Sequence, residues 1–473
     1  MYEPKKVNNY SFVVEPQGNM RVPLKIFASD ALLAKMVEDG SIMQGVNVAS
    51  LEGIEGFSLM MPDAHQGYGF SIGGVAAFNL DNGIISPGGI GYDINCGVRL
   101  LSSSLKKEDV LDKLPLLLDV LFKKIPPGVG EKSEFRVDDS ELDDLMTRGP
   151  SWAVKRGIGF EEDLELCESR GMMPLADPSK VSQKARSRGK SQLGTLGSGN
   201  HFIEIQVVDE IFDDVSAKVF GINEPGQVVI LIHSGSRGLG HQVCSDYIRL
   251  MEDSQSVDLP DKSLINAPIN SNLGRDYFGA MCAAANFAWT NRHIMAHQVR
   301  ASFSEVFGRG VELKTVYDVA HNIAKLEEHL IDGSLKKVLV HRKGATRAFP
   351  KNHVDLPVKY RGVGQPIFIP GSMGTSSYVL VGAENSLNES FGSTAHGAGR
   401  MLSRFAAKKL WSGQQVKDDL KKNNILVKAS SLRGISEEAP LAYKDVDEVV
   451  KISNDAGIAG LVARLKPLGV IKG

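Results

Sequence analysis

Residue types that commonly bind metal ions stand at five places where an apolar run gives way to small residues. Asp93 and Cys96 are three residues apart in a Gly-rich segment, so one tight turn could bring a carboxylate and a thiol together. His201, His233 and His321 each lie beside small or polar residues at the end of a strand-like run. This mixed set of ligands suits two borderline divalent ions, Mn2+ or Zn2+, which a thiolate could bridge. Any one of these residues alone is more often structural, so the prediction depends on their convergence.

A different chemistry is indicated by His396, which lies in the segment Ala-His-Gly-Ala-Gly-Arg. We predict a loop here that opens a helix over 398–409 and leaves the imidazole accessible. A neutral imidazole is a competent nucleophile toward an activated phosphorus. Arg400 could neutralise phosphate charge, the main requirement of phosphoryl transfer. The alternative is an ordinary helix start with glycines for close packing.

Two further segments could assist such a reaction. Asp63 and His65 are two residues apart ahead of Gly-rich backbone, and could orient another catalytic group. A turn with an Asx cap is the more common explanation for that pattern. The segment Ser-Gly-Ser-Arg-Gly at 234–238 offers backbone N–H groups and the guanidinium of Arg237, both of which suit phosphate.

The segment 197–205 alternates polar and apolar residues after two glycines. A strand with this pattern would place Asn200, Phe202 and Glu204 on one face and His201 on the other. One face could then hold a base and a phosphate while His201 turns toward a metal. The glycines precede a strand and not a helix, so they do not form a dinucleotide-binding fingerprint.

Strands and turns are needed to position these groups. The run Gln-Val-Val-Ile-Leu-Ile-His at 227–233 predicts a buried strand that delivers His233 at its carboxyl end. Shorter strand-like runs occur at 311–319, 367–370 and 378–381. Helical spacing or composition predicts helices over 100–122, 160–169, 277–307 and 398–409.

Strand and helix signals interleave along the chain without a clean boundary. We therefore expect a mixed α/β (α+β) fold in which residues 1–473 form a single large catalytic domain. The stretch 126–192 is polar and broken by Gly and Pro, and is a candidate variable insertion within that domain.

The overall charge does not indicate a nucleic-acid partner, because the 54 basic residues nearly balance the 56 acidic ones. An RNA-binding surface would have to be local, and 184–190 and 341–361 are basic stretches that could supply one. A solvated loop is an equally good interpretation of either stretch. Four cysteines without a C-x-x-C pair favour a reducing compartment. We see no apolar signal or membrane segment, so a cytoplasmic protein is expected.

Taken together, these segments resemble the RtcB family of RNA-splicing ligases. Seven motifs match in the family order from about residue 60 to the C-terminus, which is far more specific than any single match. They are Pro62-Asp63-Ala64-His65, Asp93-Ile94-Asn95-Cys96-Gly97-Val98-Arg99, Gly197-Ser198-Gly199-Asn200-His201-Phe202, His233-Ser234-Gly235-Ser236-Arg237-Gly238, Asp318-Val319-Ala320-His321-Asn322, Pro370-Gly371-Ser372-Met373-Gly374 and His396-Gly397-Ala398-Gly399-Arg400.

The resemblance implies an RtcB-type domain with a central metal- and nucleotide-binding cleft. It implies a GTP-dependent ligase with two Mn2+ ions, in which His396 becomes a histidine–GMP phosphoramidate. GMP then passes to an RNA 3′-phosphate, formed where necessary from a 2′,3′-cyclic phosphate, and a 5′-hydroxyl displaces it. Transfer-RNA halves and other cleaved RNAs carry such ends, and an activating protein partner is a further expectation.

Residue roles follow from the same resemblance. Asp63 matches the carboxylate that orients the nucleophile, and Arg400 lies within the His396 motif. The family's metal ligands match Asp93, Cys96, His201, His233 and His321, with Cys96 as the bridge. Its guanylate contacts match Asn200, Phe202, Glu204, Ser372, Tyr443 and Lys472.

Two other classes of protein compete with this interpretation. A binuclear metallophosphoesterase acting on RNA ends would use the same metals, but it would need neither the His396 nucleophile nor a guanine pocket. A noncatalytic RNA-binding protein would need none of the five metal ligands. Dependence on GTP separates both alternatives from the ligase.

Overall fold

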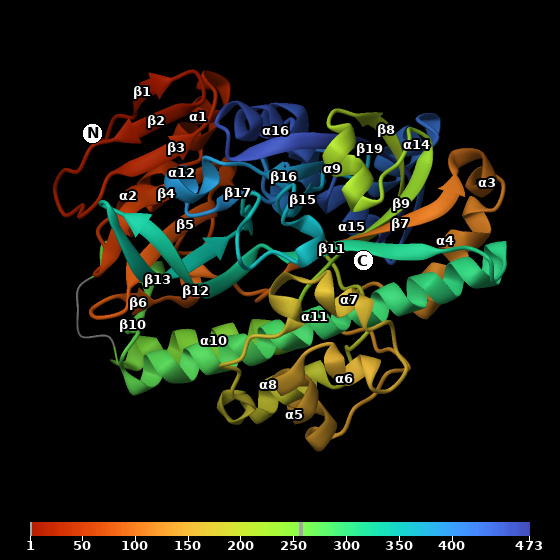
Figure 1. Cartoon of the computed structure of the whole chain (residues 1–473), viewed down its shortest axis with the longest axis horizontal. Helices are drawn as coiled ribbons and strands as arrows, with labels where there is room; N and C mark the ends of the chain where they lie inside the picture. Colours follow the sequence, from red (N-terminus) through yellow and green to blue (C-terminus); the bar gives the residue numbers. More distant parts are fainter. Residues whose placement is uncertain (1, 255–258) are drawn as a thin grey trace.

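The computed structural model describes residues 2–254 and 259–473. Two large β-sheets lie side by side, with helices packed around them (Figure 1). The first sheet has seven strands, antiparallel except where β3 meets β4. In spatial order they are β1 (Lys5–Asn8), β2 (Ser11–Val14), β3 (Leu24–Phe27), β4 (Ile54–His65), β5 (Ile72–Asn79), β13 (Ser334–Lys343) and β12 (Asn322–Ile331).

The second sheet has eight strands: seven lie along its main path, and β18 (Leu426–Ala429) pairs in parallel with β19 off that path. In spatial order the seven strands of the main path are β11 (Leu313–Ala320), β7 (Gly97–Lys106), β9 (Gln227–Ser234), β8 (Phe202–Ile211), β19 (Ala459–Lys472), β16 (Ser377–Gly382) and β15 (Pro366–Ile369), and neighbours along it are hydrogen-bonded. Two short ladders join β6 (Ile84–Ile85) to β10 (Ala267–Pro268) and β14 (Ala345–Arg347) to β17 (Ser393–Ala395).

Helices account for most of the remaining regular structure. The longer ones are α1 (Asp30–Glu38), α2 (Ser41–Val48), α4 (Leu114–Lys124), α5 (Asp139–Arg148), α10 (Arg237–Ser254), α11 (Asn272–Phe307), α14 (Gly413–Lys422) and α16 (Val446–Asp455). The shorter ones are α3 (Lys107–Leu111), α6 (Ser151–Val154), α7 (Glu162–Glu165), α8 (Gln183–Gly189), α9 (Asp214–Phe220), α12 (Ser386–Ser390), α13 (Arg404–Leu410) and α15 (Leu432–Glu437). The mixed α/β fold class is therefore confirmed.

Strand β9 is buried along its whole length, as its unbroken apolar run predicts. Leu231 packs into a core on one face of the sheet, whereas Ile230 and Ile232 pack into a second core on the other face. Val98 and Leu100 of β7 join the first of these cores, and Leu101 joins the second. Because both faces are covered, the strand can carry a polar side chain only near its end, where His233 lies.

Helix α11 passes along the second sheet and separates it from α5, α6 and α8 (Figure 1). Ser271 caps its first turn by accepting a hydrogen bond from the backbone N–H of Gly274, and Gly308 ends it. The helix is buried over most of its length because it contacts the sheet on one side and residues of the 126–192 stretch on the other. That stretch shares a core with α11, while its identity as a variable insertion stays a prediction.

Three predicted helices differ from the structure. The stretch 100–122 begins within strand β7, because Leu100 and Leu101 pair with β9 and β11. The helical spacing of Leu114, Leu117 and Leu121 corresponds to helix α4. Only Glu162–Glu165 of 160–169 is α-helical. Helix α13 begins at Arg404, six residues later than expected, because Gly399 adopts a left-handed φ of 72° and Ser403 supplies the cap.

All four cysteines are buried free thiols. Among the described helices, none combines the length and the hydropathy that crossing a lipid bilayer requires.

Candidate active site

The five predicted metal ligands converge in the folded chain. They form two groups of three: Cys96 with His233 and His321, and Cys96 with Asp93 and His201. Within each group, the potential ligand atoms all lie within 4.8 Å of one another. Cys96 belongs to both groups, so its sulfur is placed where one thiolate could serve two ions.

The distances between ligand atoms describe a compact cluster. Cys96 Sγ lies 3.4 Å from His201 Nε2 and 3.2 Å from His233 Nε2. The Nε2 atom of His233 is 3.3 Å from that of His321, and His201 Nε2 is 2.8 Å from Asp93 Oδ2. All four of the imidazole and thiol ligands are almost completely buried.

Strand register brings three of the ligands together. Strand β7 lies between β9 and β11, and its first residue, Gly97, pairs with Ser234 on one side and with Ala320 on the other. Cys96 precedes Gly97, His233 precedes Ser234 and His321 follows Ala320. The three side chains therefore emerge at one edge of the sheet.

A tight turn adds the carboxylate. The backbone N–H of Cys96 donates to the carbonyl of Asp93, which confirms the predicted turn. Asn95 adopts a left-handed φ of 52°, a conformation that asparagine tolerates better than most residues. Gly235 has no side chain at the position where a Cβ would lie 2.4 Å from the Asp93 carboxylate, so the backbone of the 234–238 segment approaches that group closely.

Arginine 292 fixes the backbone around the cluster from helix α11. Its guanidinium donates to the carbonyls of Asn95 and Ser234, at 2.7 and 2.9 Å, and makes an ion pair with Asp318. The side chain is completely buried. Each of the two carbonyls belongs to a residue adjacent to a candidate metal ligand. This one side chain therefore links the backbone just before β7 to the last residue of β9.

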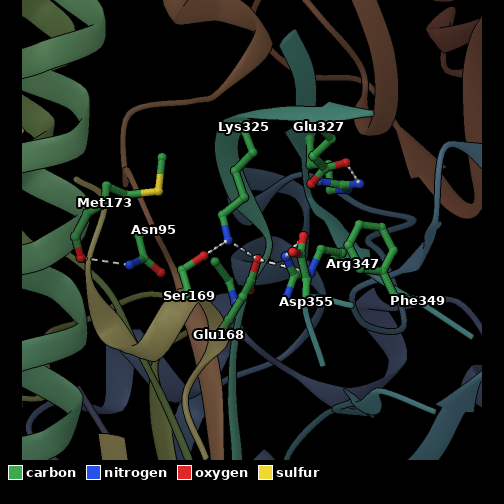
Figure 2. Close-up of polar contacts among 12 residues, drawn as sticks. Asn95, Glu168, Ser169, Met173, Lys325, Glu327, Arg347, Phe349 and Asp355 are labelled. Carbon is green, nitrogen blue, oxygen red and sulfur yellow. Dashed lines mark hydrogen bonds and ion pairs between the residues drawn. The ribbon is translucent and has the colours of Figure 1, made fainter. Parts of the chain in front are cut away.

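A second buried ion pair supports the β11 end. Figure 2 shows Lys325 pointing toward Glu168 and Ser169, with Arg347 on the other side of Glu168. Glu168 accepts a hydrogen bond of 2.8 Å from the backbone N–H of Ala320, and it pairs with Lys325 Nζ at 2.5 Å. This carboxylate therefore anchors the residue next to His321.

Three of the six basic residues in the stretch 341–361 are buried in ion pairs or hydrogen bonds, whereas Lys351, Lys359 and Arg361 are exposed. Arg342 pairs with Glu327, and Arg347 lies 3.6 Å from Glu168. Lys343 donates to backbone carbonyls of Tyr68 and Phe70. These three cations are buried because the stretch contains strands β13 and β14, so their charge balances internal acids and carbonyls.

The electrostatics of the cluster favour a bound cation. Burial and the neighbouring Asp93 carboxylate raise the pKa of the Cys96 thiol well above its usual range. Burial also lowers the pKa of His233 and His321 well below the usual value, which keeps both imidazoles neutral. Neutral imidazoles are metal ligands, and a thiolate at this position requires positive charge nearby. The donor set and its charges therefore fit a borderline divalent metal.

His396 lies beside this cluster, and its ring centroid is 4.8 Å from that of His321. Its Nδ1 is 2.6 Å from Asp63 Oδ2, and its backbone N–H donates to the same oxygen. The interaction with His396 overcomes the burial of Asp63 and lowers the pKa of this carboxyl. An ionised carboxylate at Nδ1 requires the proton there, which leaves Nε2 with a free lone pair.

The surroundings of both residues differ from expectation. Asp63 lies in strand β4 and not in a turn with an Asx cap. His396 follows β17 and is only 13% exposed, so it is less accessible than a helix-opening loop implies. Strand β17 pairs with β14 and contacts β4 of the first sheet, while β14 contacts β5 of the first sheet and β11 of the second.

A cavity of about 200 Å³ is lined by His396. Most of the predicted nucleotide-contacting and catalytic residues line it. They are Asn200, Phe202, Ser372, His396, Arg400, Tyr443 and Lys472, together with His233 of the metal cluster. The cavity is thus contiguous with the candidate metal site, as the prediction of a central cleft requires.

Glu204 is the one predicted nucleotide contact that does not line this cavity. It is buried in β8, where its carboxylate accepts a hydrogen bond of 2.6 Å from Gln206 Nε2. Burial raises the pKa of Glu204 to about 8, although Gln206 and Lys472 oppose the shift. Lys472 is paired with Phe202 across the β8–β19 ladder, and its Nζ lies 5.4 Å from that ring.

Arg400 is held by protein groups at the cavity wall. Its Nη1 lies 3.2 Å from a carboxylate oxygen of Glu438 and 3.1 Å from the Tyr443 hydroxyl. Arg404 pairs with the same Glu438 at 3.0 Å, but half of its side chain is exposed. Arg237, the cation of the 234–238 segment, is buried and lies 3.3 Å from His201 Nδ1.

Two charged residues that line the cavity were not indicated by the sequence. Glu438 and Arg404 lie in a C-terminal segment without glycine-rich landmarks, so no local signal distinguished them. His65, which the sequence singled out together with Asp63 as a group that could orient another catalytic residue, also lines the cavity.

Two candidate ligand triads that share a thiol, next to a carboxylate-bound histidine, are typical of a metal-dependent enzyme. The family model described as tRNA-splicing ligase RtcB matches residues 44–473, and the chain belongs to the RtcB family. A "tRNA-splicing ligase RtcB" of Thermococcus kodakarensis is 56% identical over 460 residues, which cover 96% of this chain and 95% of that protein. Proteins with the same description from Pyrobaculum aerophilum and Nanoarchaeum equitans are 53% and 51% identical, and each match covers 99% of both chains.

Proposed function

We propose that this chain is an RNA ligase that uses GTP and Mn2+ to join RNA ends through a guanylylated His396. The observation that carries the proposal is the orientation of His396. Asp63 binds its Nδ1 at 2.6 Å, so its Nε2 lone pair is available in a cavity beside the two ligand triads. A nucleophile activated by a buried carboxylate, next to metal ligands, is suited to attack on a phosphate.

The proposed reaction has three transfers. His396 Nε2 attacks the α-phosphorus of GTP, and pyrophosphate leaves. An oxygen of the RNA 3′-phosphate then attacks the phosphorus of the histidine–GMP and releases the imidazole. Finally, the 5′-hydroxyl of a second RNA end attacks the activated 3′-phosphorus, and GMP leaves as the phosphodiester forms. A 2′,3′-cyclic phosphate would first be hydrolysed to the 3′-phosphate.

Two Mn2+ ions would be held by the two triads, with Cys96 as the shared ligand. Bound Mn2+ would neutralise charge on the phosphates during each transfer. Mn2+ fits the donors better than Mg2+, which prefers oxygen alone. The protein's own contribution is to fix the ligands through Arg292 and Glu168, so that little reorganisation is needed when phosphate arrives.

Guanine recognition would rest on the β8 and β19 side of the cavity. Phe202, Tyr443 and Lys472 line that side, and Glu204 lies behind it in β8. A carboxylate can accept hydrogen bonds from guanine N1–H and from its 2-amino group, neither of which adenine offers. Burial holds the pKa of Glu204 at about 8 in spite of Lys472, so the N–H donors of bound guanine would have to stabilise the ionised form that this role requires. Asn200 and Ser372 would contact the remainder of the nucleotide.

The substrates would be RNA ends with a 3′-phosphate or 2′,3′-cyclic phosphate and a 5′-hydroxyl, such as transfer-RNA halves. The names of the relatives favour transfer RNA among these. An activating protein partner would change the rate at which His396 is guanylylated, but the same residues would carry out the reaction.

The test is to incubate Mn2+-loaded protein with α-labelled GTP, denature it, and measure label on the chain. An acid-labile adduct should form on the wild type and be absent from His396→Ala. His353→Ala is the matched control, because His353 lies outside the cavity and should leave labelling unchanged. Absence of label on the wild type, with and without added RNA, would contradict the proposal and favour the metallophosphoesterase.

A further inference from the structure

His65 is a second imidazole in the same cavity as His396. It is the last residue of β4, two positions after Asp63, and it is only 9% exposed. It belongs to neither ligand triad, and the proposed transfers of GMP do not use it. Its ring is therefore a polar group in the cavity wall that has no role in the proposed transfers of GMP.

The tautomer of His65 is fixed by its hydrogen bond. Its Nδ1 lies 2.9 Å from the backbone carbonyl oxygen of Asp63. A carbonyl oxygen can only accept, so Nδ1 carries the proton and Nε2 holds the lone pair. Within residues 2–254 and 259–473, Nε2 makes no hydrogen bond and is not among the enclosed polar atoms, so it opens toward the cavity.

Asp63 thus orients two imidazoles at once. Its carboxylate binds Nδ1 of His396, and its backbone carbonyl binds Nδ1 of His65. Both rings are held by Nδ1, and both present Nε2 as a free acceptor. One is placed to attack phosphorus, and the other is available to receive a proton.

The surroundings keep His65 in its neutral, proton-accepting form. Burial lowers its pKa to about 4, and the nearby Lys444 ammonium acts in the same direction. Lys444 is anchored by donation to the carbonyl of Ala64, the residue between Asp63 and His65. When RNA phosphates enter, their negative charge would raise the pKa of His65 toward its ordinary value and strengthen it as a base.

Of the three proposed transfers, only the last has a nucleophile that carries a proton. The imidazole of His396 and the oxygen of an RNA 3′-phosphate both attack as free lone pairs. A 5′-hydroxyl must lose its proton as its oxygen bonds to phosphorus. An acceptor in the cavity is therefore needed at the joining step and not at the two steps before it.

Building on the proposed function, we propose that His65 is a further catalytic residue, which accepts the proton of the RNA 5′-hydroxyl in the joining step. The hydroxyl oxygen forms a new bond to the activated 3′-phosphorus, and the bond from that phosphorus to the GMP oxygen breaks. The hydroxyl proton passes to His65 Nε2, and the electron pair of the broken bond leaves with GMP. His65 returns the proton to solvent before the next cycle.

The experiment measures the steps separately, with RNA that carries a labelled 3′-phosphate and a partner that carries a 5′-hydroxyl. For His65→Ala we expect histidine–GMP formation within about two-fold of the wild type. Joining should slow by about 10²- to 10⁴-fold, the usual contribution of a general base, and GMP-capped RNA should accumulate.

His65→Asn is the variant that separates catalysis from support. Its amide can still donate to the Asp63 carbonyl, but it offers no nitrogen lone pair at the position of Nε2. Accumulation of capped RNA in both variants supports the inference. Joining restored by asparagine, or adduct formation lost in both variants, would reduce His65 to a support for Asp63 and overturn it. If the wild type itself forms no adduct, the proposed function fails, and the role of His65 fails with it.

Discussion

Cys96 is the residue on which both halves of the metal cluster depend, because it is the only member common to the two triads found in the described parts of the chain. The other four ligands each serve one triad. Burial and Asp93 raise the pKa of this thiol, so the proposed metal ions would stabilise the thiolate that binds them.

Replacing Cys96 with serine should therefore abolish binding of both metal ions, whereas His321→Ala should remove one. Metal content of the purified protein after dialysis against Mn2+ measures this directly. Cys244→Ser is the matched control, since Cys244 is also a buried free thiol but lies outside the cluster. Retention of two tightly bound ions by Cys96→Ser would contradict the shared-ligand geometry.

Glu204 predicts a pH dependence of stability. Its folded-state pKa of about 8 lies above the ordinary value of 4.5, so the folded protein holds a proton that the unfolded chain has released. The stability that this proton provides is present below about pH 4.5 and is lost progressively as pH rises toward 8, at a cost on the order of a few kcal/mol. Glu204→Gln should flatten the decline in thermal midpoint between pH 5 and 8. Parallel curves for variant and wild type would show that Glu204 ionises normally.

At the scale of elements, helix α11 connects the ends of three strands through Arg292. The helix contributes a single guanidinium that contacts residues next to two candidate ligands and pairs with Asp318 of β11. A loop could not hold this cation so firmly, because α11 is itself buried between the sheet and the 126–192 stretch.

Arg292→Met should lower metal affinity about 10- to 100-fold, as is typical when support for metal ligands is lost. It should also destabilise the fold, but by less than the roughly 3–5 kcal/mol of a buried charge left without any partner, because Asp318 keeps its ion pair with Arg99. Arg300→Met is the matched control on the same helix. It breaks the ion pair with Asp163 but touches no ligand turn, so stability should fall while metal affinity is kept. Equal losses of metal affinity in the two variants would indicate that the loss comes from general destabilisation of the fold and not from the contacts of Arg292.

On the scale of the whole molecule, the site lies between two sheets, and neither sheet builds it alone. The first sheet supplies Asp63 and His65 from β4, and the second supplies Phe202, His233 and Lys472 from β8, β9 and β19. Metal and nucleotide should consequently stabilise the molecule as a unit.

We expect Mn2+ at about 100 times its dissociation constant to raise the free energy of unfolding by about 2.7 kcal/mol per independent site. Calorimetry should show one unfolding transition that moves upward as a whole. The shift should be absent in Cys96→Ser. Two transitions, only one of which responds to Mn2+, would contradict the prediction that residues 1–473 form a single domain.

Much of this arrangement is specified by short-range signals in the sequence. The apolar run before His233 could only be a buried strand, and the three-residue spacing of Asp93 and Cys96 predicted the turn that the structure contains. Ordered motifs also sufficed to predict the family, which the match over 44–473 confirms. Local propensity misled where tertiary pairing overrode it: Leu100 and Leu101 fit a helical repeat but were drawn into β7 by strands on both sides.

Only the tertiary structure could decide which distant groups meet. The convergence of the five ligands depends on β7 lying between β9 and β11, and strand order is set by long-range packing that no local spacing encodes. For the same reason, the sequence could not reveal Arg292, Glu168 or Glu438, which act through partners tens to hundreds of residues away. The sequence by itself determined which groups are available for chemistry, and the fold determined their neighbours, because burial and charge at each group depend on contacts between remote segments.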